Sequence, residues 1–95
     1  MIGVICKLKV QKERIDEFEQ LIMQFKAEVD EHEPGNLEYN VFKEGHGEYY
    51  VLEKFRDREA LKEHDSTKHK ETISPKVGKL LDAKPEVRVL EPLSN

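Results

Sequence analysis

The chain has 95 residues, which is the length of one small domain rather than two. Charged residues make up 38% of it and hydrophobic residues only 37%, a balance that excludes a membrane protein. The net charge of −4 lacks the basic excess of a nucleic-acid-binding domain, and the single cysteine excludes an intrachain disulfide or a cysteine-rich zinc site. We therefore expect a cytoplasmic protein with a single domain over residues 1–95 and neither nucleic-acid nor membrane partners.

The first third of the chain changes its hydrophobic period once. Apolar residues alternate with others over residues 2–10, which predicts a strand. They then recur every three or four positions, which predicts an amphipathic helix over residues 11–32. Pro34 and Gly35 should end this helix, because proline cannot continue it and glycine supplies the turn.

The middle of the chain has the pattern of a β-hairpin. Two alternating stretches, residues 37–42 and 49–56, flank the turn Gly45-His46-Gly47. Such stretches around a short glycine-containing loop predict two paired antiparallel strands.

The last third is predicted to contain short helical pieces and a final strand. Asp57 has the side chain of an N-cap, and the pattern breaks at residues 66–67. Ser74 and Pro75 are expected to be the N-cap and first residue of a further piece. Residues 85–90 alternate again and predict the last strand.

The predicted order is strand, helix, strand, strand, helix, strand. It defines an α+β fold of the ferredoxin-like βαββαβ type, with one antiparallel sheet and helices on a single face. The opposite face of the sheet would be too apolar for a monomer to leave exposed, so the sequence predicts a homodimer with two sheets face to face. The residues expected on that face are Ile5, Phe42, Tyr50, Leu52 and Leu90.

Glu53 is the strongest candidate for chemistry. It shares a strand face with Tyr49, Val51 and Phe55, which is the face expected to meet the first helix. A buried carboxylate is costly unless it is paired, and burial raises its pKa in a way that suits proton transfer. The alternative is a structural carboxylate that is bonded to a tyrosine, a histidine or a backbone amide.

His64 is the natural partner of Glu53, because it shares its helical face with Ala60 and Leu61 and so points toward the sheet. Histidine transfers protons near neutral pH, although a core histidine with satisfied hydrogen bonds has the same pattern. His69 could line a pocket or simply begin a helix. The spacing of these groups is not typical of a metal site, and no cofactor-binding motif occurs, so we predict neither a metal nor a cofactor.

The chain resembles the antibiotic biosynthesis monooxygenase domain family over almost its whole length. The segments that carry the resemblance are Ile2 to Val10, Glu33-Pro34-Gly35, Leu37-Glu38-Tyr39, Tyr50 to Phe55, and Ala60-Leu61-x-x-His64-x4-His69. The resemblance implies a dimeric α+β barrel, in which two ferredoxin-like sheets close on each other. It also implies a substrate pocket between the sheet and the helices, lined by Tyr39, Val51, Glu53, Phe55, His64 and His69.

Members of this family differ in function, and they include phenolic polyketide oxygenases, quinol monooxygenases, heme-degrading enzymes and an isomerase of a phosphorylated autoinducer. The positions that match the Asn, Trp and His of the heme-degrading branch are Cys6, Phe55 and Ser74, which argues against heme cleavage.

Three functions follow from the residues and the resemblance. The first is a cofactor-independent monooxygenase of a small quinol-like or phenolic substrate, with Glu53 and His64 moving protons. The second is an isomerase or tautomerase of a small carbonyl compound, phosphorylated or not, which requires cations such as Lys54, Arg56 or Lys68 near the pocket. The third is a non-catalytic dimeric ligand-binding domain.

Overall fold

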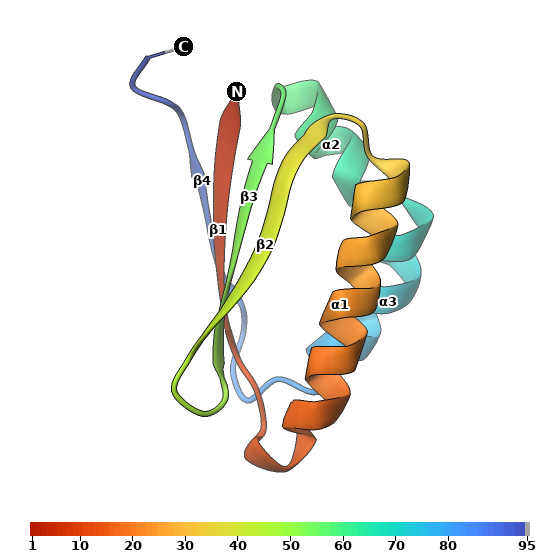
Figure 1. Cartoon of the computed structure of the whole chain (residues 1–95), viewed down its shortest axis with the longest axis vertical. Helices are drawn as coiled ribbons and strands as arrows, with labels where there is room; N and C mark the ends of the chain where they lie inside the picture. Colours follow the sequence, from red (N-terminus) through yellow and green to blue (C-terminus); the bar gives the residue numbers. More distant parts are fainter. Residues whose placement is uncertain (95) are drawn as a thin grey trace.

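The computed structural model describes residues 1–94, so Asn95, the last residue of the predicted domain, lies outside the described part. Its four strands form one antiparallel sheet in the order β2-β3-β1-β4 (Figure 1). Helices α1, α2 and α3 all lie on one face of this sheet, which confirms the predicted α+β, ferredoxin-like βαββαβ fold. The elements are β1 (Ile2–Lys9), a 3-10 turn (Lys12–Arg14), α1 (Ile15–His32), β2 (Asn36–Glu44), β3 (Glu48–Phe55), α2 (Arg58–Asp65), α3 (Lys68–Gly78) and β4 (Glu86–Leu90).

The register of the central strands places Glu53 among residues of the helix-facing side. Strand β3 lies between β1 and β2, with Glu53 opposite Val4 on one side and opposite Tyr39 on the other. Val4 and Tyr39 are buried core residues. Since side chains alternate along a strand, the same face of β3 also carries Val51.

The main core forms between α1 and the sheet. Phe18 and Phe25 of α1 are buried, and the Phe18 ring lies 4.6 Å from the ring of Tyr49. Burying a side chain of this size contributes about 1.5–3 kcal/mol to folding. A second, smaller cluster joins Phe55 and Val4 of the sheet to Ala60 of α2. The sheet is thus held by two groups of contacts, and the second one fixes α2 above β3.

The caps of the second helical region agree with the sequence in one case and differ in the other. Asp57 caps α2, because its carboxylate accepts a hydrogen bond of 2.8 Å from the backbone N–H of Ala60. Helix α3 begins after the predicted break at residues 66–67, where the hydroxyl of Thr67 accepts a hydrogen bond from the N–H of Lys70. It then runs without interruption to Gly78. Pro75 therefore lies inside α3, near its exposed end, and the prediction that Ser74 is an N-cap was wrong.

Gly35 has a different role from the one predicted. Within residues 1–94, the positive φ angles belong to Gly45 and Gly47 in the hairpin turn, so Gly35 is not needed for a left-handed turn. A Cβ atom at Gly35 would instead lie 2.5 Å from the Cβ of Ala60. Glycine is required here because the turn after α1 passes directly over α2.

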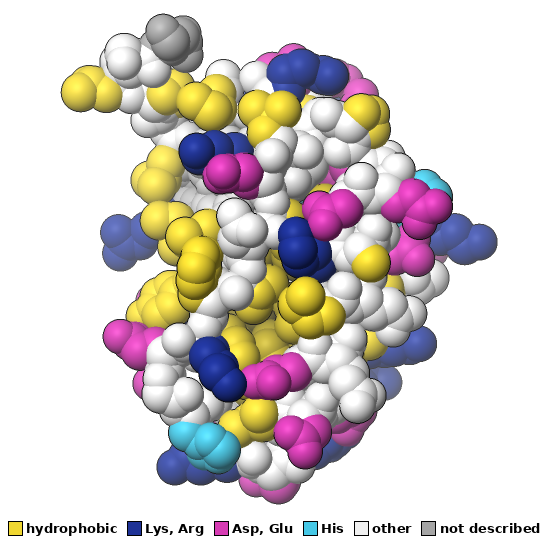
Figure 2. All heavy atoms as spheres, viewed as in Figure 1, with side chains coloured by type: hydrophobic (Ala, Val, Ile, Leu, Met, Phe, Trp, Pro, Cys, Tyr) yellow, Lys and Arg dark blue, Asp and Glu magenta, His cyan; other side chains and the backbone are white. Residues whose placement is uncertain are grey.

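The face of the sheet that lacks helices is rich in exposed apolar side chains. Phe42 is 53% exposed, Leu52 38% and Leu90 44%. Figure 2 shows hydrophobic side chains gathered on the strand side of the molecule, whereas charged side chains cover the helices. No helix within residues 1–94 is long and apolar enough to cross a membrane.

Candidate active site

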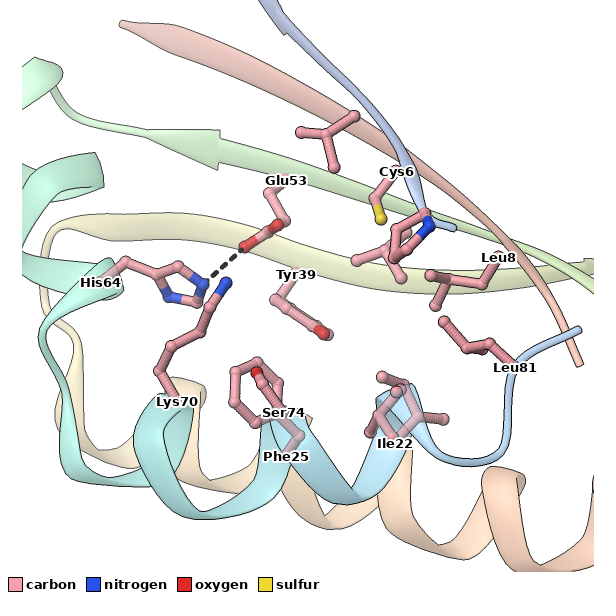
Figure 3. Close-up of a pocket in the computed structure, with 15 residues that line it drawn as sticks. Cys6, Leu8, Ile22, Phe25, Tyr39, Glu53, His64, Lys70, Ser74 and Leu81 are labelled. Atoms are coloured by element: carbon pink, nitrogen blue, oxygen red, sulfur yellow. Dashed lines mark ion pairs between the residues drawn. The ribbon is translucent and has the colours of Figure 1, made fainter. Parts of the chain in front are cut away.

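A cavity of about 220 Å³ lies between the helix-facing side of the sheet and helices α1 and α3 (Figure 3). Its walls are mostly apolar and its polar groups are few. The residues that line it are Cys6, Leu8, Ile22, Phe25, Tyr39, Val51, Glu53, His64, Lys70, Ser74, Val77, Gly78, Leu81, Pro85 and Val87.

Glu53 is the carboxyl group of this cavity. Its side chain is only 9% exposed, and it accepts a long hydrogen bond of 3.4 Å from the Asn36 amide. Burial raises the pKa of Glu53 to about 7, and the charge of Lys70 opposes part of that rise. A carboxyl group with such a pKa is present in both protonation states near neutral pH, so it can accept a proton and return it.

His64 approaches Glu53 from α2. Its side chain is 5% exposed, and its Nε2 atom lies 4.0 Å from the Glu53 Oε1 atom (Figure 3). Burial lowers the pKa of His64, which favours the neutral imidazole. The separation exceeds that of a direct hydrogen bond but is within reach of a small shift or one bridging water.

Glu33 is a buried carboxylate that the sequence analysis treated only as part of a turn. It is the C-cap residue of α1, and its oxygens lie 2.8 and 3.0 Å from Nδ1 of His64. Its Oε2 atom is also 2.5 Å from Nε2 of His69. A sequence signal was present, because a carboxylate at the C-terminal end of a helix opposes the helix dipole and so needs a partner.

Two residues that the resemblance placed in the pocket lie elsewhere. His69 reaches Glu33 and borders a separate surface groove between α1 and α3. Phe55 has no exposed surface, since it packs in the cluster with Ala60, and its ring centre is 5.3 Å from that of His64. Phe55 therefore packs against His64 and His69 holds Glu33, and neither residue lines the cavity. Tyr39 and Val51, by contrast, do line it.

The cation of the cavity is Lys70, which the sequence analysis did not select. Figure 3 shows its ammonium group turned toward Glu53 and His64, and its Nζ atom lies 3.6 Å from an oxygen of Asp65. The proposed cations Lys54, Arg56 and Lys68 are exposed and do not line the cavity. Lys70 was missed because no local sequence pattern shows that the packing of α3 turns this side chain toward β3.

The site therefore combines a carboxyl group of raised pKa, a neutral imidazole and an ammonium group in an otherwise apolar pocket. Within residues 1–94, no group of three His, Cys, Asp or Glu side chains is placed to hold a metal ion. What the arrangement can do chemically is acid–base work on a small molecule that is shielded from water. Fold and pocket together define an α+β, ferredoxin-like domain with an acid–base site between its sheet and its helices.

Comparison with known proteins gives the family. Residues 1–74 match the antibiotic biosynthesis monooxygenase family, and the chain belongs to it. A candidate antibiotic biosynthesis monooxygenase from Caulobacter crescentus CB15 has 32% identical residues and a TM-score of 0.94, over 98% of this chain and 90% of that one. A conserved protein from Methanosarcina mazei Go1 has 27% identity and a TM-score of 0.88, over 94% and 89% of the two chains.

A protein from Mycobacterium tuberculosis is similar over 99% of this chain and 96% of its own, with 26% identity and a TM-score of 0.90. Among curated proteins, none matches the chain. The comparisons thus show the family and the fold of the chain.

Proposed function

We propose that the protein is a cofactor-independent monooxygenase that acts on a small quinol-like or phenolic molecule. The observation that carries this proposal is Glu53, a carboxyl group of raised pKa on the wall of an apolar cavity, with His64 4.0 Å away. A phenolic hydroxyl reacts with oxygen more readily after it loses its proton, and Glu53 is suited to accept that proton. Membership of the family supports the same reaction class.

The proposed reaction takes its electrons from the substrate. A quinol and one O₂ molecule give a hydroxyquinone and one water, so one oxygen atom enters the ring and the other leaves reduced. Glu53 accepts the hydroxyl proton, His64 shares it, and Lys70 stabilises the phenolate through its charge. The apolar walls exclude water, which strengthens each of these interactions.

The size of the cavity favours a small substrate. Its volume of about 220 Å³ lies below the roughly 300–1,000 Å³ that is usual for pockets of drug-sized ligands. We therefore expect a molecule of one or two rings rather than a polycyclic polyketide.

Oxygen consumption by the purified protein tests the proposal. With a panel of one- and two-ring quinols, we expect oxygen uptake. The product should be about 14 mass units heavier than the quinol, because the balanced reaction adds an oxygen atom and removes a pair of hydrogen atoms. Glu53→Gln keeps the shape of the side chain but cannot accept a proton, so it should lower kcat by about 10²–10⁴-fold.

The matched control is Glu38→Gln, which changes an exposed carboxylate that pairs with Lys54 away from the cavity. This variant should keep full activity. Absence of oxygen uptake across the whole panel would contradict the proposed reaction.

Lys70 favours a second candidate, an isomerase or tautomerase of a small carbonyl compound. An ammonium group beside an acid–base pair is suited to an enolate or to an attached phosphate, and the same pair could then move a proton between carbon atoms. Turnover of such compounds that is unchanged without oxygen, together with no quinol oxidation, would favour this candidate over the monooxygenase.

We also propose that the protein works as a homodimer, in which two sheets close into an α+β barrel. The exposed apolar residues on the free face of the sheet support this. A cytoplasmic location is proposed on the basis of the single free cysteine.

A further inference from the structure

The Glu33 carboxylate is held between two histidines, and its position is costly for the fold. Its side chain is 7% exposed, and it lies at the C-cap of α1, where the helix dipole disfavours a negative charge. His64 of α2 and His69 of α3 bind its two oxygens from different helices. Apolar side chains could hold the helices together without the cost of desolvating a carboxylate.

The contacts of Glu33 define which ring nitrogen of His64 carries the proton. An ionised carboxylate only accepts hydrogen bonds, so the Nδ1 atom of His64, 2.8 Å away, must be the N–H donor. A neutral imidazole has a single N–H group. Its Nε2 atom therefore presents a lone pair to Glu53, whose Oε1 atom is 4.0 Å distant.

We propose that Glu33 is the positioning residue of the site, which fixes His64 in the Nδ1–H tautomer so that Nε2 is a proton acceptor facing Glu53. His69 has the supporting role of a second donor that holds Glu33 in place. The inference deepens the proposed function and rests on it only for its catalytic consequence, because the tautomer itself is a property of the free protein.

The consequence is a defined path for one proton. The proton leaves the substrate hydroxyl for Glu53 and moves from Glu53 to Nε2 of His64, directly or through one water. His64 keeps its Nδ1–H bond to Glu33 and becomes an imidazolium, whose charge is balanced by that of the Glu33 carboxylate. The Glu33–His64 pair thus changes from a net charge of −1 to zero when His64 takes up the proton.

Other charged groups around His64 affect the same equilibrium. Lys70 of α3 disfavours the imidazolium, whereas Asp65, its neighbour on α2, favours it. Glu53 of β3 faces the opposite edge of the ring. Phe25 and Phe55 flank the imidazole with ring centres 5.8 and 5.3 Å away, which limits its rotation. Glu33 is the group in direct contact with Nδ1, so its removal should have the largest effect.

Nitrogen NMR of the ¹⁵N-labelled wild-type protein tests the tautomer without any substitution. At pH 8 we expect His64 to show a protonated Nδ1 and an unprotonated Nε2. A His64 with its proton on Nε2 would overturn the proposal, and so would rapid exchange between the two tautomers.

Glu33→Gln tests the role of the charge. The amide keeps the shape of the side chain but cannot balance an imidazolium, so the titration midpoint of His64 should fall by about 1–3 pH units. The kcat of quinol oxidation should fall at least 10-fold, while KM stays within about twofold. Glu33→Asp keeps the charge on a shorter side chain, so it should restore part of the titration midpoint of His64 and part of kcat.

His46→Gln is the matched control, because His46 lies exposed in the hairpin turn, at the end of the sheet opposite α2 (Figure 1). It should change neither the tautomer nor the midpoint of His64. An unchanged midpoint in Glu33→Gln would overturn the positioning role. If the wild type oxidises no quinol but shows the expected tautomer and midpoint, the proposed reaction fails and the assignment of Glu33 stands.

Discussion

Glu33 and Glu53 are two buried carboxyl groups on opposite edges of His64, and their surroundings are very different. Glu33 receives hydrogen bonds from two imidazoles, whereas Glu53 receives one long bond from the Asn36 amide. A carboxylate that lacks strong donors in a buried site is more stable in its protonated form. Burial therefore raises the pKa of Glu53 to about 7, since its one long hydrogen bond offsets little of the lost hydration, and this pKa suits proton exchange.

Stability should depend on pH through Glu53. The folded protein holds the proton of Glu53 up to a pKa of about 7, whereas the unfolded chain loses it near 4.5. Between these values the folded state binds more protons, so the free energy of unfolding should fall as pH rises and level off above about 7. The difference corresponds to about 3 kcal/mol.

Urea denaturation of the wild type and of Glu53→Gln at several pH values measures this effect. Because His64, Lys70 and the other groups are common to both proteins, the difference between them isolates Glu53. The glutamine variant should have similar stability to the wild type at pH 4.5 and be more stable at pH 8. If the free energies of unfolding of the two proteins changed in parallel between pH 4.5 and pH 8, the pKa of Glu53 would not be raised in the folded state.

The ring of Tyr39 packs in the core, and its hydroxyl should orient the substrate. It lines the cavity, and burial and the nearby Glu53 raise the pKa of its hydroxyl, which therefore stays protonated as a donor. Tyr39→Phe should weaken binding about 5-fold, equivalent to one hydrogen bond of about 1 kcal/mol. Calorimetric titration with a quinol measures this.

The matched control for Tyr39 is Tyr50→Phe, whose hydroxyl donates to Glu44 on the exposed side of the molecule. Quinol affinity should be unchanged in that variant. An equal loss of affinity in both variants would mean that the Tyr39 hydroxyl has no specific contact with the substrate.

At the scale of elements, the sequence predicted what depends on local periodicity and missed what depends on contacts between elements. The strands, the hairpin, α1 and the Asp57 cap follow from side-chain spacing and capping chemistry, and the inward side of Glu53 follows from strand alternation. The additional helix start predicted at Ser74 was wrong. A serine followed by proline is a strong helix-start signal, yet α3 runs from its Thr67 cap through both residues. Glu33 was overlooked because its partners come from two later helices, which no local pattern reveals.

The close approach of the turn after α1 to α2 should make Gly35 intolerant of any side chain. The added Cβ of Gly35→Ala would lie 2.5 Å from that of Ala60, so α2 must move away from the turn. We expect a loss of about 1–3 kcal/mol in stability, as for other overpacked sites. Since α2 carries His64, its contact with Glu33 should be disturbed as well.

Gly78→Ala is the control for Gly35→Ala, because a Cβ at Gly78 meets no atom within 4 Å. It lies at the end of α3, where alanine favours the helix over glycine by up to about 1 kcal/mol. Thermal denaturation should therefore show opposite changes in the two variants. Similar stability in Gly35→Ala and the wild type would mean that the turn can move away from α2 at little cost.

In the whole molecule, only one of the two faces of the sheet is covered by helices. The three helices bury one face of the sheet, whereas the other face leaves Phe42, Leu52 and Leu90 exposed. Ile5 and Tyr50 lie on the same face and are partly buried. A small domain buries a limited fraction of its surface, and an uncovered apolar sheet makes a second copy of the chain a stabilising partner.

The homodimer is tested by light scattering coupled to size-exclusion chromatography. At micromolar concentration we expect a mass near twice that of the 11.1 kDa chain. Leu52 lies near the centre of the free face, opposite Ile5 and Asn40 on the two adjacent strands. Leu52→Glu should place a charge in the interface and produce monomers, because an unpaired buried charge costs several kcal/mol. Met23→Glu, at a similarly exposed apolar residue of α1, should remain dimeric. A wild-type monomer would contradict the face-to-face arrangement, and a Leu52→Glu dimer would place the interface on another surface.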